Sequence, residues 1–255
     1  MYVRHEQEVV DQVLALAAAG VPKLRIANEL GLAPMTVRRW IASGGARQQG
    51  PPPCTEEVCA TRDQVDRAAY AYLLGQYLGD GWIDRNGRRG VERLAIACCA
   101  TYPGIVDEVQ RAVVAVNPTR RAGRVRRPGV VVVQSYSKHW HCLFPQVGAG
   151  PKHLRPIVLE SWQEAIVFRE YPRALVRGLI HSDGWRGINR VRGANGRRYE
   201  YTRYQFTNLS ADIQDIFKRA CDVIGVEWRQ MTRTDVAVSR RASVALLDAF
   251  VGQKF

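Results

Sequence analysis

The sequence predicts an α+β protein in which the element order αββαββα is written twice, after a small all-α domain. Two apolar helical segments end alike, in Asp80-Gly81 and in Asp183-Gly184, and an Asn-Gly pair in a basic stretch follows each of them. Asn-Gly is a strong β-hairpin signal because both residues tolerate positive φ, so the two segments predict a repeat. Helical periodicity between residues 5 and 42 predicts the all-α domain.

Residues 1–43 are expected to form a helix-turn-helix domain. Short apolar patterns recur at helical spacing, Gly31 stands at the predicted turn, and Pro34 suits the first turn of the helix that follows. A helical bundle that contacts proteins is the alternative, but the basic net charge favours DNA binding. The side chains expected to face the major groove are Met35, Thr36, Arg38 and Arg39.

Residues 44–64 have the composition of a linker that stiffens toward Pro51-Pro52-Pro53, and two halves follow, at 65–160 and 161–255. In each half we expect a helix, a hairpin, a second helix, a second strand pair and a last helix. The return strands of the hairpins are expected at 94–99 and 199–207, and the second helices at 104–116 and 211–224. The clearest later strands are 130–136 and 235–239. The last helices are expected to begin near 138 and 242.

Small residues lie four apart in both repeated helices, Gly75 and Gly79 in the first and Gly178 and Ser182 in the second. Such a strip on one helical face lets another backbone approach closely. Two helices packed in this way would bring the aspartates at their ends side by side. A carboxylate at a helix C-terminus meets the negative end of the macrodipole, and a local rule broken twice indicates a functional site.

Length and charge narrow the class of protein. The 255 residues, 46% of them hydrophobic, are enough for one large or two smaller domains with a core. A formal net charge of +13 attracts polyanions, above all nucleic acid, and arginine suits contacts to phosphate and guanine, although a GC-rich genome also enriches it. No apolar run suffices to span a membrane and no signal peptide is recognisable, so we expect a cytoplasmic, nucleoid-associated protein.

The six cysteines have no regular spacing, and in a cytosolic chain they are expected to stay reduced. Cys54 and Cys59 form a C-x4-C pair, but no clear second pair accompanies them. A structural zinc site is therefore not expected on these residues. Its further ligands would be His139, His141, Cys142 and His153.

With the repeat and both motifs in view, residues 65–255 resemble a single-chain LAGLIDADG homing endonuclease. The motif copies are Leu73-Leu74-Gly75-Gln76-Tyr77-Leu78-Gly79-Asp80-Gly81 and Val176-Arg177-Gly178-Leu179-Ile180-His181-Ser182-Asp183-Gly184. The resemblance implies that the motif helices pack at a pseudo-twofold axis and that each half places a saddle-shaped antiparallel sheet in the DNA major groove. It also implies that the last acidic residue of each motif holds divalent metal. The earlier acidic position of the family is Leu78 in one copy and His181 in the other.

For the site, the resemblance implies two or more Mg²⁺ ions at the interface of the halves, held by Asp80 and Asp183, with Gly79 and Ser182 as neighbouring ligands. The family often adds a basic residue beyond the last strand of each half. Lys152 and Lys254 fit, at 152 − 80 = 72 and 254 − 183 = 71 residues after the aspartates. Each lysine would either assist the attacking water or contact a phosphate. His181 would either approach the metal or pack in the core.

Arginines on the predicted strands are expected to contact DNA. Gln134, Tyr136, Tyr201 and Gln205 are weaker candidates, and Trp82 and Trp185 are expected to be wedges at the interface of the halves. The arginines are Arg85, Arg88, Arg89, Arg120, Arg121, Arg124, Arg126, Arg127, Arg186, Arg190, Arg192, Arg197, Arg198 and Arg203.

The function expected from these features is a monomeric, sequence-specific, Mg²⁺-dependent endonuclease of double-stranded DNA with an auxiliary helix-turn-helix. One alternative is a transcriptional regulator that retains the fold and binds DNA without cutting it, so that the aspartates are relics. Another is an RNA-binding splicing maturase. The helix-turn-helix argues against the maturase, because the major groove of A-form RNA is too narrow for a reading helix.

Overall fold

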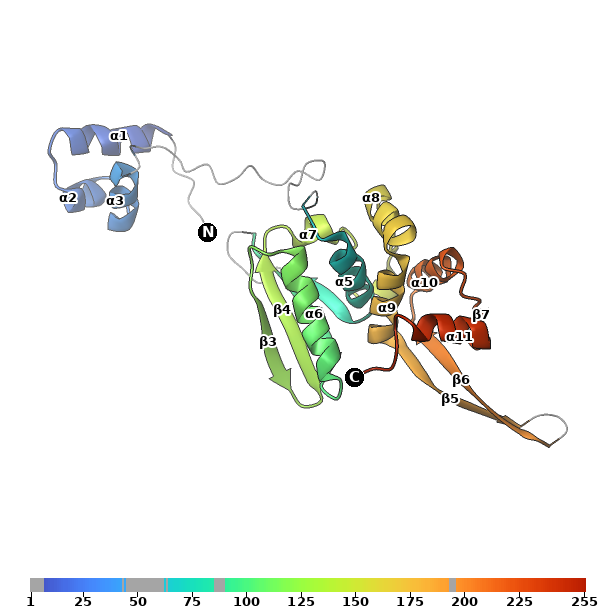
Figure 1. The fold of residues 1–255 in the computed structure, drawn as a ribbon. Coiled ribbons are helices and arrows are strands. Elements are labelled where there is room, and N and C mark those ends of the chain that lie inside the picture. Colours follow the sequence, from blue (N-terminus) through green and yellow to red (C-terminus); the bar gives the residue numbers. More distant parts are fainter. Residues whose placement is uncertain (1–6, 43, 45–61, 63, 85–89, 193–195) are drawn as a thin grey trace. The chain divides into compact units, whose positions relative to one another are not determined.

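The protein was analysed as a computed structural model, which describes residues 7–42, 44, 62, 64–84, 90–192 and 196–255 (Figure 1). It divides into two compact units, Met1–Cys54 and Thr55–Phe255. No helix in these ranges is long and apolar enough to cross a membrane.

The first unit contains three helices, α1 (Gln7–Ala18), α2 (Lys23–Glu29) and α3 (Pro34–Ala42). They enclose a small core around Val13, Ile26 and Val37. Gly31 has a φ of 61° in the turn between α2 and α3, a conformation that glycine adopts without strain. The predicted helices are confirmed, whereas the DNA-binding role of this unit stays a prediction.

The second unit follows the predicted order αββαββα twice, and its two sheets are four-stranded and antiparallel, with the orders β1-β2-β4-β3 and β5-β6-β8-β7. A connection with three short helical turns, which the sequence did not predict, joins the halves: η1 (Lys152–Leu154), α8 (Ser161–Glu164) and the π-helix η2 (Ala165–Glu170). The first half is α5 (Arg67–Asp80), β1 (Gly81–Asp84), β2 (Glu92–Cys99), α6 (Pro103–Val116), β3 (Ala122–Arg127), β4 (Val130–Ser137) and α7 (Trp140–Leu143). The second half is α9 (Pro172–Asp183), β5 (Gly184–Arg192), β6 (Arg198–Thr207), α10 (Ala211–Val223), β7 (Arg229–Gln230), β8 (Asp235–Val238) and α11 (Arg241–Asp248).

Helices α5 and α9 pack backbone against backbone at the centre of the unit. A Cβ atom added to Gly75 would lie 2.6 Å from the carbonyl oxygen of Leu175, and one added to Gly178 would lie 2.2 Å from that of Tyr72. At these positions only glycine leaves room, so the predicted strip of small residues is confirmed. The approach places the C-terminal ends of both helices side by side.

Each sheet has a helix face, which packs on the helices of its half, and an open face on the other side. Arg124 of β3 donates to Asp107 of α6, and Arg186 of β5 donates to Asp248 of α11, which identifies the helix faces. Successive side chains of a strand point to opposite faces of the sheet, so the register assigns each of the other strand residues to the helix face or to the open face. The open faces carry Trp82, Asp84, Arg93, Val125, Arg127, Gln134 and Tyr136 in the first half, and Trp185, Asn189, Val191, Tyr199, Tyr201, Arg203 and Gln205 in the second.

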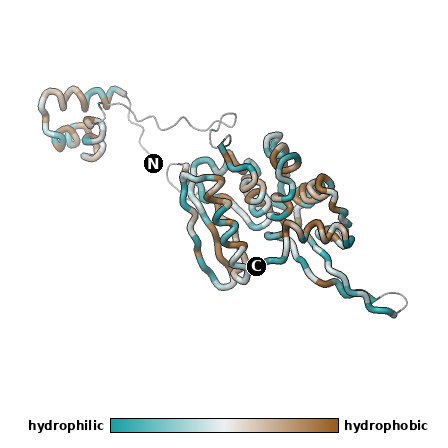
Figure 2. The backbone as a smooth tube through the Cα atoms, viewed as in Figure 1, coloured by the Kyte–Doolittle hydropathy of each residue, from teal (hydrophilic) through white to brown (hydrophobic). Residues whose placement is uncertain are grey.

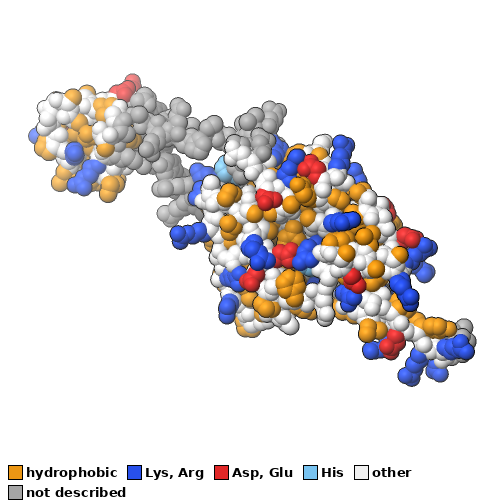
Figure 3. All heavy atoms as spheres, in the orientation of Figure 1, with side chains coloured by type: hydrophobic (Ala, Val, Ile, Leu, Met, Phe, Trp, Pro, Cys, Tyr) orange, Lys and Arg blue, Asp and Glu red, His pale blue; other side chains and the backbone are white. Residues whose placement is uncertain are grey.

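The two sheets differ in length. The pairing of β5 with β6 runs over nine residue pairs, from Gly184 with Phe206 to Arg192 with Arg198, but β8 pairs with only four residues of β6. The outer part of β5 and β6 therefore extends as a two-stranded ribbon (Figure 1). Its outer end is hydrophilic (Figure 2) and carries exposed basic side chains (Figure 3).

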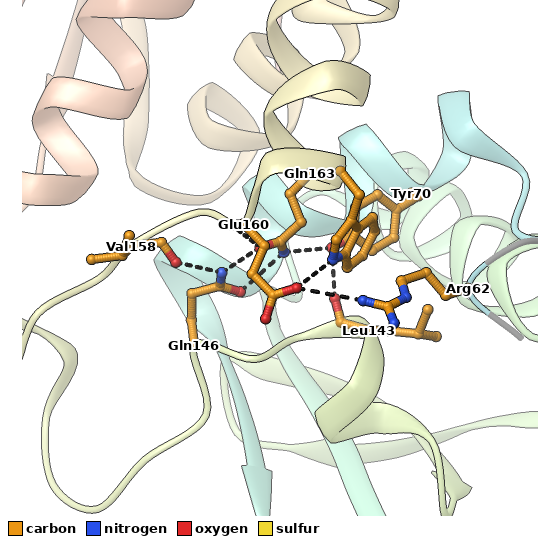
Figure 4. A network of polar contacts seen from close by, with 8 residues as sticks. Arg62, Tyr70, Leu143, Gln146, Val158, Glu160 and Gln163 are labelled. Atoms are coloured by element: carbon orange, nitrogen blue, oxygen red, sulfur yellow. Dashed lines mark hydrogen bonds and ion pairs between the residues drawn. The ribbon is translucent and has the colours of Figure 1, made fainter. Parts of the chain in front are cut away.

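A polar network fixes the connection between the halves to the start of α5 (Figure 4). The buried Gln163 donates to the Tyr70 hydroxyl at 2.7 Å, and that hydroxyl donates to the carbonyl oxygen of Leu143 at 2.6 Å. Gln146 donates to Gln163 and to the carbonyl oxygen of Val158. These bonds satisfy buried polar groups that would otherwise be costly, and they anchor both ends of the segment that carries Lys152.

Candidate functional site

Asp80 and Asp183 are the last residues of α5 and α9, and the close helix packing brings them into one site. A Cβ atom on Gly79 would lie 2.9 Å from the Oδ2 atom of Asp183 and 2.2 Å from the Oγ atom of Ser182. Glycine at position 79 therefore lets the two helix ends meet. The sequence predicted this meeting from the two motifs alone.

The surroundings of the two carboxyl groups disfavour their charges. Burial raises the pKa of Asp80, although Lys152 and Lys254 oppose the shift. Burial and the charge of Asp80 raise the pKa of Asp183 to about 6. Two acids that share one partly desolvated site repel each other, and a cation between them would relieve the repulsion.

Lys152 and Lys254 bind the C-terminal carbonyl groups of the two helices. The Nζ atom of Lys152 donates to the carbonyl oxygens of Tyr77, Leu78 and Gly79 at 2.5, 3.0 and 3.0 Å. The Nζ atom of Lys254 donates to that of Ser182 at 3.2 Å. The last carbonyl groups of a helix lack intrahelical partners, although that of Tyr77 also accepts from the N–H of Gly81. The ammonium groups offset the negative helix ends that carry the aspartates.

Burial lowers the pKa of Lys152 to about 8, and the charges of Asp183 and Asp80 partly oppose the shift. Burial also lowers the pKa of Lys254. The spacing argument placed both lysines at the site correctly, but their contact with the helix ends was not predicted.

Asn208 is a site residue that the sequence analysis missed. Its Nδ2 atom donates to the Oδ2 atom of Asp183 at 2.6 Å and so lowers the pKa that burial raises. Gly81 pairs with Ile96 and Gly184 with Phe206, so Asn208 corresponds in register to Cys98, which lies two residues after Ile96. Cys98 is buried, and burial raises its pKa to about 12, so a neutral thiol stands beside Asp80 where an amide stands beside Asp183.

The donor set fits a hard divalent cation. Two carboxylates would supply oxygen ligands of the kind that Mg²⁺ prefers, with water and phosphate oxygens as its further ligands. The carbonyl oxygens of Gly79 and Ser182 accept from the lysines, but each carbonyl keeps a second lone pair. A groove of about 430 Å³ opens beside the site, lined by Gly79, Trp82, Lys152, Asp183 and Asn208 among others.

The register divides the predicted DNA contacts between the two faces of the sheets. Arg203, Gln205, Gln134, Tyr136, Tyr201 and Arg127 lie on the open faces. Arg124, Arg126 and Arg186 lie on the helix faces, and Arg190, Arg192 and Arg198 lie on the same side of β5 and β6 but on the ribbon beyond β8. Alternation turns these side chains away from the open face, so their contact with DNA stays a prediction.

Ion pairs hold two of the helix-face arginines against helices. Arg124 binds Asp107 and Gln110, and the ion pair of Arg186 with Asp248 raises the pKa of Arg186. In contrast, Arg93 lies on the open face, bound to Asp84 and Gln134, and the sequence analysis did not name it. Period-two alternation along β2, with Leu94 and Ile96 buried on the helix face, would have found it.

The remaining candidates lie elsewhere. Arg120 and Arg121 lie in the turn before β3, and Arg197 directly precedes β6. In the first unit, Met35 and Arg38 are exposed on α3 and Thr36 is half-buried. The candidates outside the described residues or side chains are Arg85, Arg88, Arg89 and Arg39.

The tryptophan prediction is wrong for Trp185, which is 48% exposed on its open face. Trp82 is 39% exposed on its open face and also lines the groove that residues of both halves form. His181, in contrast, packs in the core, which is one of the two roles expected for it. Its Nδ1 atom lies 3.1 Å from the Tyr72 hydroxyl, and burial lowers its pKa to about 4.

The cysteine region gives no metal cluster in the part that can be described. Cys54 and Cys59 lie outside the described residues, and within the described ranges no three His, Cys, Asp or Glu side chains gather to hold an ion. The Nδ1 atom of His141 instead lies 2.9 Å from the Oε2 atom of Glu92, and the Sγ atom of Cys142 lies 3.3 Å from the Nε2 atom of His141.

No protein-family model matches the chain, and no curated protein does. Among solved structures, the chain is similar to mesophilic variants of the homing endonuclease I-DmoI, at 17% identity and a TM-score of 0.48, over 73% of this chain and 97% of that one. It is also similar to I-DmoI in complex with DNA and Mn, at 15% identity and a TM-score of 0.46, over 74% and 99% of the two chains. The meganuclease I-SmaMI bound to uncleavable DNA gives 8% identity and a TM-score of 0.45, over 72% and 84%. At such identities no residue role is carried across, and the functional argument rests on the side chains of this chain.

Proposed function

We propose that the protein is a sequence-specific, divalent-metal-dependent endonuclease that cuts both strands of double-stranded DNA. The observation that carries the proposal is the meeting of Asp80 and Asp183 at two helix ends with a lysine bound beside each. Phosphodiester hydrolysis requires an attacking water, neutralisation of the charge that develops on phosphate, and assistance to the leaving oxygen. Two or more bound Mg²⁺ ions would supply this Lewis-acid chemistry.

The chain's own residues hold and orient the reacting groups. Asp80 and Asp183 bind the cation, with the carbonyl groups of Gly79 and Ser182 next to them. Lys152 and Lys254 keep the helix ends neutral and add positive charge beside the scissile phosphates. One chain supplies both carboxylates, so a single copy suffices for the site, and we propose a monomer with an internal pseudo-dimer.

The open faces of the two sheets are the proposed DNA surface. They present amide, hydroxyl and aromatic groups that can contact bases, together with Arg93, Arg127 and Arg203 for phosphate or guanine. The first unit, through Met35, Thr36, Arg38 and Arg39 on α3, is a proposed second contact with the major groove. We also propose that the protein acts in the cytoplasm, at the nucleoid, where its DNA substrate would lie. The arginines of helix faces and turns are proposed for phosphates at the sheet margins, and they are Arg120, Arg121, Arg126, Arg190, Arg192, Arg197 and Arg198.

The test is incubation of the protein with a randomised duplex library, in Mg²⁺ and separately in Ca²⁺, followed by sequencing of bound and cut molecules. The proposal predicts enriched sequences that are cut in Mg²⁺ and retained intact in Ca²⁺. Enriched sequences that stay intact in Mg²⁺ would instead identify a DNA-binding regulator. No enrichment in either ion would contradict DNA recognition itself.

A further inference from the structure

The segment that carries Lys254 crosses from the second half to the first. The backbone N–H groups of Gly104 and Ile105 donate to the carbonyl oxygen of Phe255 at 3.0 and 3.3 Å. These N–H groups belong to the first turn of α6, whose donors lack the usual intrahelical acceptors. The N–H of Ile105 also donates to the carbonyl oxygen of Tyr102 at 3.1 Å, so the contact gives Gly104 its acceptor from the second half and shares that of Ile105.

The ring of Phe255 lies directly on Gly104. A Cβ atom added to Gly104 would lie 1.9 Å from Cδ2 and 2.0 Å from Cε2 of that ring. Alanine at position 104 would therefore displace the ring. The ring also meets the buried His181 edge-on, with centroids 6.4 Å apart, so it touches both halves.

Besides the attraction of the Asp80 and Asp183 charges, Lys254 has few contacts. It makes one hydrogen bond, to the carbonyl oxygen of Ser182, and its Nζ atom lies 5.8 Å from the centroid of the Tyr102 ring. A lysine side chain loses substantial conformational entropy when it is fixed, and one bond offsets only part of that loss. The neighbouring residue must supply the remaining order.

The first half anchors its own lysine segment in a related way. Beyond Lys152, the backbone N–H of Ile157 donates to the Oδ2 atom of Asp212 at 2.7 Å. Asp212 lies in the first turn of α10, and α10 occupies the place in the second half that α6 occupies in the first. Each lysine segment is thus tied to the corresponding helix of the opposite half, by different chemistry.

We propose that Phe255 is a positioning residue, which with Gly104 holds Lys254 at the end of α9. The role of Lys254 in DNA cutting rests on the proposed function, but its placement does not. Arg177 separately fixes the preceding residues, because it binds Glu108 of α6 and the carbonyl oxygens of Phe250 and Val251. Loss of the Phe255 ring therefore loosens Lys254 and leaves the fold intact.

The first test measures amine reactivity and needs no DNA. The full-length protein is acetylated briefly at low reagent concentration, and modification of each lysine is quantified by mass spectrometry. F255A and G104A are expected to raise the reactivity of Lys254 about tenfold, the change expected when one charge-assisted hydrogen bond is lost. Lys152 serves as the internal reference, F255Y should behave as the wild type, and V223A is the control for an equally exposed apolar side chain.

G104A distinguishes the ring contact from a simple effect on helix α6. If Gly104 mattered only as a helix residue, alanine would not disturb the segment that carries Lys254. Alanine is a better helix former than glycine, so without the ring contact the substitution should be neutral or stabilising. If Lys254 keeps its wild-type reactivity in both F255A and G104A, the positioning role is wrong. A circular-dichroism melt of each variant identifies any that fail to fold, and F255L then replaces F255A.

The second test measures cutting of a duplex obtained from the library selection. K254M, F255A and the double variant should slow cutting by the same factor, about 10²-fold, as expected for a misplaced group. Additive losses would overturn the proposal. If the wild type cuts no DNA, the proposed nuclease function fails while the reactivity result still decides the placement of Lys254.

Discussion

The two halves share a backbone plan but hold their carboxylates differently. Asp183 accepts a hydrogen bond from Asn208, whereas Asp80 stands beside the thiol of Cys98 at the matching position. Lys152 binds three carbonyl groups at the end of α5, and Lys254 binds one at the end of α9. Symmetry of the chain path therefore does not extend to the site, and the two halves should respond unequally to equivalent substitutions.

The largest expected effect comes from replacing either aspartate, and it should be similar in the two halves. D80N and D183N should each lower the rate of double-strand cutting about 10³-fold or more, since each removes a charge that binds the cation. DNA affinity should change little, because the open faces remain intact. Rates come from gel assays on the selected duplex and affinities from fluorescence anisotropy in Ca²⁺. A variant that still cuts both strands at the wild-type rate would exclude its aspartate from the site.

Replacement of the two lysines should lower the stability of the protein by different amounts. K152M removes three charge-assisted contacts with a helix end and should cost about 2 kcal/mol of the free energy of unfolding. K254M removes one and should cost less than about 1 kcal/mol. Urea denaturation of the metal-free variants measures both. Equal losses would mean that the extra carbonyl contacts of Lys152 contribute nothing to stability.

The raised pKa of Asp183 should make metal-free stability depend on pH. Its folded-state pKa of about 6 exceeds the ordinary value of 3.8, so the native state binds the additional proton between these values. Its contribution to stability is complete below pH 4 and is lost as the pH rises through 6, by about 3 kcal/mol. Melts between pH 4 and pH 7 should show a steeper fall for the wild type than for D183N. Parallel curves would contradict the raised pKa.

Replacement of Asn208 should slow the cutting of one DNA strand more than that of the other. N208A removes the hydrogen bond that orients Asp183 and should slow one of the two nicking steps about tenfold, the equivalent of one charge-assisted bond. C98A, its register counterpart, should leave both steps within about twofold, since a neutral thiol is a weak donor. Duplexes labelled on either strand separate the steps. Equal slowing of both strands by N208A would remove the inequality between the halves.

The smallest effects distinguish the two faces of the sheet. R203A removes a charge from the open face and should reduce the salt slope of DNA binding by about 1, whereas R186A, bound to Asp248 on the helix face, should leave the slope unchanged. Anisotropy titrations at several salt concentrations measure both slopes. A larger change for R186A would reverse the assignment of the faces.

The sequence predicted the fold well because its signals are local. Small residues four apart in the motif helices required close packing, and the Asn-Gly pairs marked two hairpins, so the repeat and the meeting of Asp80 with Asp183 followed. The face of each strand residue was missed for Arg186 and Trp185, because the analysis counted basic and aromatic residues without applying alternation from the buried glycine. Asn208 could not be found, since its role depends on the register that aligns it with Cys98 across halves of unequal loops.

The most direct measurement of the central claim is the anomalous diffraction of Mn²⁺ in crystals of the protein with its selected DNA. One site built from both halves predicts anomalous peaks between the carboxylates of Asp80 and Asp183, in contact with both and with a phosphate oxygen of the DNA. Peaks confined to other acidic residues, or DNA bound with both carboxylates far from any phosphate, would contradict the account.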